Sequence, residues 1–135
     1  MEIDIRQLAA KNTQIPVERF TFLQDANDYL IREWKCAILF VFAAWSGPAR
    51  AGWYRLTRVL SNFELHSVDL LVIDIDCLNA DDMLRIFGRV LGGAGETFWI
   101  RDGQVQHEVA TYCVEAEADI SANTEQLLAE ANASS

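Results

Sequence analysis

A run of ten apolar residues, Cys36–Trp45 with the sequence CAILFVFAAW, constrains the fold more than any other part of the chain. No polar residue interrupts this run, which is the pattern of a strand that is buried on both faces of a parallel sheet. The run is too short to span a bilayer, for which a helix needs about 20 apolar residues. A strand covered on both faces needs helices above and below the sheet, so the run predicts an α/β domain.

The sequence on either side of this run supplies the other elements of such a domain. β-rich segments and helically spaced apolar positions follow one another in the order β-α-β-α-β-α-β-β-α. The predicted strands are Val17–Leu23, Cys36–Trp45, Val68–Asp76 and two short strands within residues 96–113, joined by a turn at Asp102 and Gly103. The predicted helices are Asp25–Lys35, Ser46–Phe63, Asn79–Leu91 and Thr124–Ala133, the last preceded by a polar connection at 115–123. Helices between successive strands imply parallel pairing, and the terminal hairpin adds antiparallel pairs.

The two ends of the chain differ in character from this domain. Residues 1–16 contain one short apolar-periodic piece, IDIRQLAA, which stops before Pro16, and we expect an N-terminal extension there. Residues 17–131 then form the domain, and the small-residue tail 132–135 is expected to be disordered. The start of the chain lacks the basic region and apolar core of a secretory signal, so we expect a cytoplasmic protein without a membrane segment.

The charge is strongly acidic and unevenly distributed. The net charge is −9, and residues 102–135 contain seven acidic side chains and no Lys or Arg. Such a surface repels a phosphate backbone, which argues against nucleic acid as a partner. Two interpretations stay open: a solvated acidic surface that aids solubility, or an acidic face that binds a basic partner.

Three motifs together point to a known family. The second predicted strand leads through WSGPAR into a helix, the third ends in VIDID, and the later hairpin reads TFWIRDGQV. In this order the motifs resemble the thioredoxin family over about residues 17–131. The family pattern at the strand-to-helix turn is Trp-Cys-Gly-Pro-Cys-Lys, of which Trp45, Gly47 and Pro48 match and Arg50 keeps the charge. The resemblance implies a central mixed five-stranded sheet flanked by about four helices, with the N-terminal extension added.

Every position that would carry the family's redox chemistry departs from its pattern. The resemblance places Ser46 where the attacking Cys would be and Ala49 where the resolving Cys would be. The buried acid that assists proton transfer falls at Phe40, and the cis-proline of the facing loop falls at Gly95. A cis bond before a non-proline residue costs roughly 2.5–4 kcal/mol, so we expect a trans bond before Gly95. The frame of a thioredoxin is therefore expected without its redox centre.

Ser46 is not expected to act as a nucleophile in place of the lost thiol. A serine nucleophile needs a base within hydrogen-bond reach, and the chain has only two histidines. His66 precedes the third strand, at the opposite edge of the sheet from Ser46, and His107 falls in the middle of a strand. We interpret Ser46 as the N-cap of the following helix, and we expect no catalytic residue.

The three cysteines are expected to be separate thiols. In the sheet order that the resemblance implies, Cys77 and Cys113 end strands about 14 Å apart at about 4.8 Å per strand, which is too far for a disulfide. Cys36 starts the second strand, at the far end of the sheet. Separate thiols suit a reducing compartment. The histidine and cysteine spacing fits no zinc site, and we expect no metal and no cofactor.

With the redox centre absent, the resemblance still implies a binding surface around the strand-to-helix turn. In thioredoxins the groove around this turn binds extended peptide, so we expect a partner-binding groove and a protein or extended peptide as the partner. The candidate residues are Trp45, Ser46, Gly47, Pro48, Ala49, Arg50, Gly93, Ala94, Gly95 and Glu96. The hypothesis is a redox-inactive binding module that serves as a chaperone, adaptor or assembly factor. The alternatives are an acidic inhibitor or immunity-type protein that neutralises a basic partner, and an enzyme with residual thiol chemistry at Cys77 or Cys113.

Overall fold

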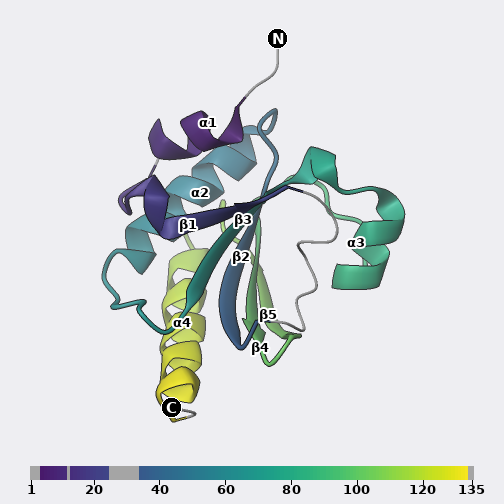
Figure 1. Ribbon diagram of the computed structural model, residues 1–135. Helices are drawn as coiled ribbons and strands as arrows, with labels where there is room; N and C mark the ends of the chain where they lie inside the picture. Colours follow the sequence, from purple (N-terminus) through teal and green to yellow (C-terminus); the bar gives the residue numbers. More distant parts are fainter. Residues whose placement is uncertain (1–3, 12, 25–33, 134–135) are drawn as a thin grey trace.

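The computed structural model describes residues 4–11, 13–24 and 34–133, and it shows one five-stranded mixed sheet with helices on both faces (Figure 1). The strands are β1 (Phe20–Leu23), β2 (Cys36–Phe42), β3 (Asp69–Asp74), β4 (Glu96–Arg101) and β5 (Gln104–Ala110). Their order in the sheet is β1-β3-β2-β4-β5. β3 pairs in parallel with β1 and with β2, while β4 pairs antiparallel with β2 and with β5. The predicted fold class, with its parallel strands and antiparallel hairpin, is therefore confirmed.

The central strand β2 divides the core into two halves. All seven of its residues are buried, as the apolar run predicts. Because side chains alternate along a strand, Ile38 and Phe40 join the cluster on one face, while Leu39 and Val41 join the cluster on the other. β2 is thus the strand around which both layers of helices are built.

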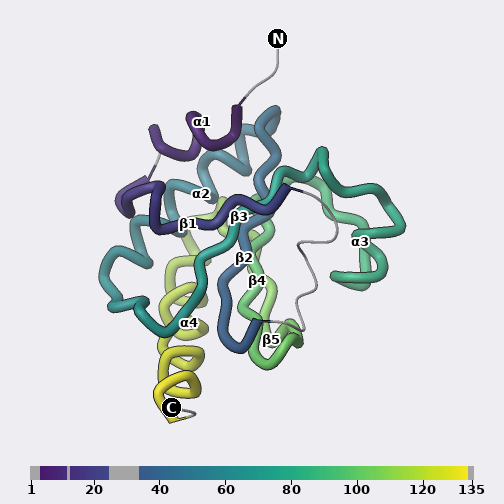
Figure 2. The backbone as a smooth tube through the Cα atoms, viewed as in Figure 1, coloured from purple at the N-terminus to yellow at the C-terminus, as the bar shows by residue number. Residues whose placement is uncertain are grey.

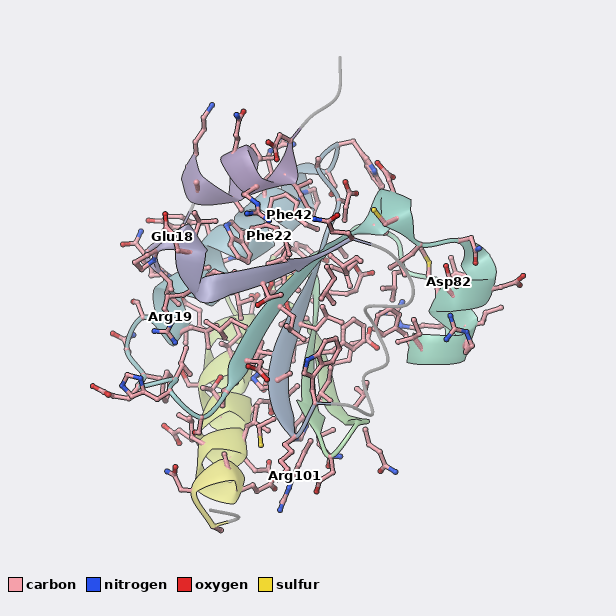
Figure 3. The ribbon with its side chains drawn as sticks, in the orientation of Figure 1. Glu18, Arg19, Phe22, Phe42, Asp82 and Arg101 are labelled. Carbon is pink, nitrogen blue, oxygen red and sulfur yellow. The ribbon has the colours of Figure 1, made fainter. Side chains whose placement is uncertain are left out.

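Among the described residues, three helices cover one face of the sheet and one covers the other (Figures 1 and 2). The first group is α1 (Ile5–Lys11), α2 (Gly47–Leu60) and α4 (Ala116–Ala133), whose buried side chains share one core cluster with β2. Figure 3 shows Phe22 and Phe42 on this face, beneath α1 and α2. On the opposite face lies α3 (Ala80–Phe87), from which Met83 enters the second cluster. No helix in the described part of the chain has the length and apolar character needed to cross a membrane.

The N-terminal helix α1 is tied to the core through Trp53. Ala9 of α1 is fully buried, and its carbonyl oxygen accepts a 2.9 Å hydrogen bond from the indole Nε1 of Trp53 in α2. Trp53 is itself fully buried and packs against Phe20 and Phe40, with ring centroids 4.7 and 5.2 Å apart. Without α1 this indole N–H would lose its partner in the core, which carries a free-energy cost. Residues 5–11 therefore pack as an integral layer of the structure.

The boundaries of several elements differ from those expected. Val17–Arg19 forms a 3₁₀ turn, in which Arg19 N donates to Pro16 O at 2.9 Å, and the strand starts only at Phe20. β2 stops at Phe42, short of the expected Trp45, because residues 43–46 form a turn in which Ser46 N donates to Ala43 O at 3.0 Å. β3 ends at Asp74, whose carboxylate accepts a hydrogen bond from Asp76 N at 2.9 Å and starts the 3₁₀ turn Ile75–Cys77.

The last helix is longer than the sequence analysis expected. α4 begins at Ala116, so most of the expected polar connection 115–123 is helical. Its buried positions Ala116, Ile120, Thr124 and Leu127 follow helical spacing, and the first two were hidden among acidic residues. α4 also continues through residues 132 and 133, the first part of the expected disordered tail. The helix expected over Asp25–Lys35 falls mainly on residues 25–33, outside the described residues.

The middle of α2 packs against backbone, and this explains a glycine inside a helix. A Cβ added to Gly52 would lie 2.8 Å from Thr111 Oγ1 and 3.3 Å from Gly95 Cα. The Thr111 hydroxyl shares its one proton between Gly52 O at 3.0 Å and Gly95 O at 3.1 Å, so the three residues bring α2, the 92–95 loop and the end of β5 together.

We expect Gly52→Ala to lower the free energy of unfolding by about 1–3 kcal/mol through overpacking. This would occur even though Ala is favoured over Gly by about 1 kcal/mol within a helix. Gly47→Ala, at a position where an added Cβ meets only the end of the Arg50 side chain at 3.9 Å, is the matched control and should change stability little. Urea denaturation measures both, and equal stability of Gly52→Ala and the wild type would contradict the packing argument.

Candidate functional site

The candidate site is built around the N-terminus of α2, where Ser46 acts as the N-cap. Ser46 has extended backbone angles (φ −106°, ψ 123°), and its Oγ accepts a hydrogen bond from Ala49 N at 3.2 Å. Pro48 lies in the first turn of α2, where a backbone N–H has no acceptor within the helix, so the missing N–H of proline breaks no helical hydrogen bond. The N-cap interpretation of Ser46 is therefore confirmed.

Ser46 also connects the helix to the facing loop. Its hydroxyl donates to the carbonyl oxygen of Gly93 at 2.5 Å while it accepts from Ala49. The side chain is buried, and Ala49, at the position of the second expected sulfur, is fully buried. The Ser46 hydroxyl thus serves as a structural bridge between residues 47 positions apart in the chain.

Trp45 is the most prominent exposed side chain of this region. Its exposed fraction is 59%. The ring lies close above Gly93, because a Cβ on Gly93 would come within 2.7 Å of the ring carbon Cη2. The indole Nε1 makes a long, 3.4 Å hydrogen bond to Asp76 Oδ1 in the turn after β3. One edge of the ring is therefore anchored while the rest faces solvent.

The loop opposite the helix is held by Glu96. The Glu96 side chain is 2% exposed, and its two carboxylate oxygens accept hydrogen bonds from Gly92 N and Ala94 N, each at 3.0 Å. Gly93 and Gly95 have φ values of +78° and +72°, which favour glycine. No cis peptide bond occurs in the described residues, so the bond before Gly95 is trans, as expected.

The structure brings the ten candidate residues together but divides them by exposure. Trp45, Gly47, Pro48 and Arg50 are exposed and Ala94 is half-buried; we call these five residues the Trp45 surface. The buried candidates are Ser46, Ala49, Gly93, Gly95 and Glu96. The expected contribution of Glu96 to a binding groove needs correction, because its carboxylate points into the loop. The sequence did not indicate Asp76 as a partner of Trp45; its only signal was its place at the end of the predicted strand Val68–Asp76, next to the strand that leads to Trp45.

The core beneath the site holds aromatic rings where the resemblance implied a buried acid. Phe40 is 1% exposed, and its ring lies 5.2 Å from Trp53 and 5.4 Å from Phe42 between centroids. The carboxyl group of Asp74, at the end of β3, is partly buried, and burial raises its pKa. Asp74 accepts its hydrogen bond from the neighbouring Asp76 N–H.

Neither histidine can serve as a base for Ser46. His66 is exposed beside Glu64, with Nε2 2.9 Å from Glu64 Oε2, and it lies before the start of β3. β2 and β3 run parallel, so their starts lie together and their ends lie together. His66 is near the start of β3 and Ser46 follows the end of β2, so the two residues lie at opposite ends of these strands. His107 pairs with Trp99 in mid-strand and lies 3.2 Å from Gln126 Oε1 of α4. Both positions agree with the sequence analysis.

The three cysteines are free, in agreement with the expectation of separate thiols. Cys36 is buried at the start of β2, Cys77 is exposed in the turn after β3, and Cys113 is half-buried before α4. Burial is the main cause that raises the pKa of the Cys36 thiol. In the part of the chain that the structure describes, no group of three or more potential metal ligands occurs.

Alkylation should distinguish the three thiols. Because a raised pKa lowers the thiolate fraction at a given pH, and burial blocks access, iodoacetamide should label Cys77 first and Cys36 last at neutral pH. Peptide mapping by mass spectrometry measures the order, and labelling in urea serves as the control because it exposes all three thiols. Equal labelling rates of Cys36 and Cys77 in the folded protein would contradict the described burial.

Comparisons with known proteins show structural similarity but no match in sequence. No protein-family model matches the chain, and none of the curated proteins matches it. Thioredoxin O2 from Arabidopsis thaliana is similar in structure, with a TM-score of 0.60 and 16% identity over 81% of this chain and 94% of that one. Thioredoxin NaTrxh from Nicotiana alata gives a TM-score of 0.61 and 16% identity over 81% and 92%. A mutant thioredoxin from Halobacterium salinarum gives 0.57 and 18% over 82% and 91%. Identities this low speak for the fold alone. The chain therefore has the thioredoxin fold.

Proposed function

We propose that the chain is a redox-inactive, thioredoxin-like protein-binding module that uses the Trp45 surface and works as a chaperone, adaptor or assembly factor. The observation that carries the proposal is Trp45 itself. A tryptophan that is 59% exposed, yet anchored by Gly93 and Asp76, offers a large apolar area whose position is already set. Such rigid aromatic side chains dominate the energetics of protein interfaces.

The absence of redox chemistry is supported by the two positions that would carry it. Ser46 is buried and uses its hydroxyl in two internal hydrogen bonds, and Ala49 has no nucleophilic atom. Phe40 supplies no proton where a buried acid would be needed. The three free thiols support a reducing compartment such as the cytoplasm.

The acidic-inhibitor alternative is weakened by internal pairing. Four of the seven acidic residues after position 101 already pair with arginines: Asp102 and Glu130 with Arg101, Glu108 with Arg89, and Glu117 with Arg58. This pairing favours a solvated, internally balanced surface. Residual thiol chemistry would depend on Cys77 or Cys113, and the side chain of Cys113 is hydrogen-bonded to that of Tyr112, which raises the pKa of Tyr112.

Disulfide reduction separates a binding module from an enzyme. The wild-type protein should reduce insulin disulfides no faster than buffer. The double variant Ser46→Cys, Ala49→Cys should remain about 100-fold or more below a thioredoxin control, because a missing general acid–base group costs about that much. Robust turnover by the wild-type protein would overturn the proposal.

Affinity capture tests the binding role. A partner retained by the wild type should be lost on Trp45→Ala, with binding weakened about 30-fold or more, as expected for an aromatic hot spot. Leu84→Ala is the matched control, since Leu84 is 52% exposed but lies on α3. Mass spectrometry identifies the partner and calorimetry with the purified partner gives the affinity. Equal binding by Trp45→Ala and the wild type would place the function elsewhere on the molecule.

A further inference from the structure

The 92–95 loop faces the Trp45 surface, and the use of its backbone groups decides how a partner can bind. A partner can pair with exposed backbone as an added strand, or it can pack against side chains. Strand addition needs N–H and C=O groups that are free to turn outward. Here the N–H groups of Gly92 and Ala94 both donate to the Glu96 carboxylate at 3.0 Å.

Two carbonyl groups of the same loop, those of Gly93 and Gly95, are also occupied. Gly93 O accepts from the Ser46 hydroxyl at 2.5 Å. Gly95 O accepts from Thr111 N at 3.1 Å and from the Thr111 hydroxyl at 3.1 Å. These donors lie at the N-cap of α2 and just after β5, so the loop is held from both sides, and four of its backbone groups are used within the protein.

Glu96 makes displacement of these bonds unfavourable. Its side chain is 2% exposed, so an incoming strand that took the two N–H groups would leave a buried carboxylate without them. A buried charge that loses its hydrogen bonds is costly. Glu96 therefore acts as an internal competitor for the backbone groups that an extended peptide would use.

The side chains of the Trp45 surface, unlike the loop backbone, present groups that a partner can contact. Trp45 presents an anchored ring, and Arg50 presents a guanidinium group whose Nη1 donates to Ala44 O at 2.9 Å. α2 contains three arginines and no acidic residue. Arg55 donates to Tyr112 O and Arg58 pairs with Glu117, whereas no carboxylate among the described residues lies within ion-pair distance of Arg50. The surface therefore combines an apolar anchor with an uncompensated positive charge.

We infer that the Trp45 surface recognises a folded protein and excludes extended peptides. The partner presents an apolar pocket for Trp45 and a carboxylate for Arg50, while Glu96 withholds the loop backbone from strand addition. This inference rests on the proposed function and names the class of partner that the surface fits.

Two displayed libraries serve as probes: random linear peptides, and a folded three-helix scaffold with a randomised surface. Panning against the wild-type protein should enrich clones from the folded library alone. Their binding should fall about tenfold or more on Trp45→Ala and on Arg50→Glu, as for hot-spot residues, and should persist on Leu84→Ala. The enriched clones should contain more Asp and Glu than the starting library.

The outcomes separate the inference from the proposed function. Linear peptides whose binding to the wild type depends on Trp45 would overturn the inference and leave the proposed function standing. If neither library yields Trp45-dependent clones, both are overturned. Trp45-dependent self-association of the wild type in sedimentation would make a second copy the occupant and would overturn the assignment of an acidic folded partner.

The role of Glu96 has its own test. In Glu96→Ala the amide protons of Gly92 and Ala94 should exchange with solvent faster than in the wild type, as measured by NMR. Linear peptides should then be enriched in panning against this variant. Glu96→Gln keeps the side-chain volume and one oxygen acceptor, and it should give an intermediate effect even if Glu96→Ala folds poorly. Unchanged exchange rates in both variants would overturn the assigned role of Glu96.

Discussion

The burial of β2 on both faces is the constraint on which the rest of the structure depends. β2 lies between β3 and β4, and all seven of its residues are buried. A strand without a solvated face cannot be stable unless other elements cover both sides. One side is covered by α1, α2 and α4, and the other side by α3. The chain then leaves the end of β2 and enters α2 through its N-cap, Ser46. The position of the candidate site is thus a consequence of the packing of this strand.

The positions that the family resemblance aligns with redox residues hold residues that stabilise this fold. Ser46 keeps the cap of α2 and adds a bond to Gly93, so the turn retains its shape without a sulfur. Phe40 and Trp53 fill the space beneath the site with aromatic rings, and Trp53 finds its hydrogen-bond partner in α1. A close-packed core of this kind has no room for an ionisable group and its water. The structural frame and the chemistry of the site are therefore separable in this fold.

The facing loop shows how a few interior contacts can change what a surface recognises. Glu96 and Thr111 hold the loop through its own backbone groups, and Gly52 allows α2 to approach it closely. These contacts occupy backbone groups that strand pairing would use, and they hold Gly93 beneath the Trp45 ring. In the proposed binding role the exposed side chains would carry the recognition, and a side chain already held in position loses less entropy on binding.

The sequence by itself determined the order of the five strands and of the helices that follow β2, the strand with two buried faces, the Asp-Gly turn and the cap at Ser46, because each depends on neighbouring residues in the chain. Only the tertiary structure decided the inward direction of Glu96, the contact of Trp45 with Asp76 and Gly93, the packing of α1 on Trp53 and the early start of α4. The Trp45–Asp76 and Trp53–Ala9 bonds join residues 31 and 44 positions apart. A local sequence pattern does not indicate which distant residues will be in contact. The need for glycine at positions 52 and 95 likewise becomes clear only from the backbone atoms that pack against them.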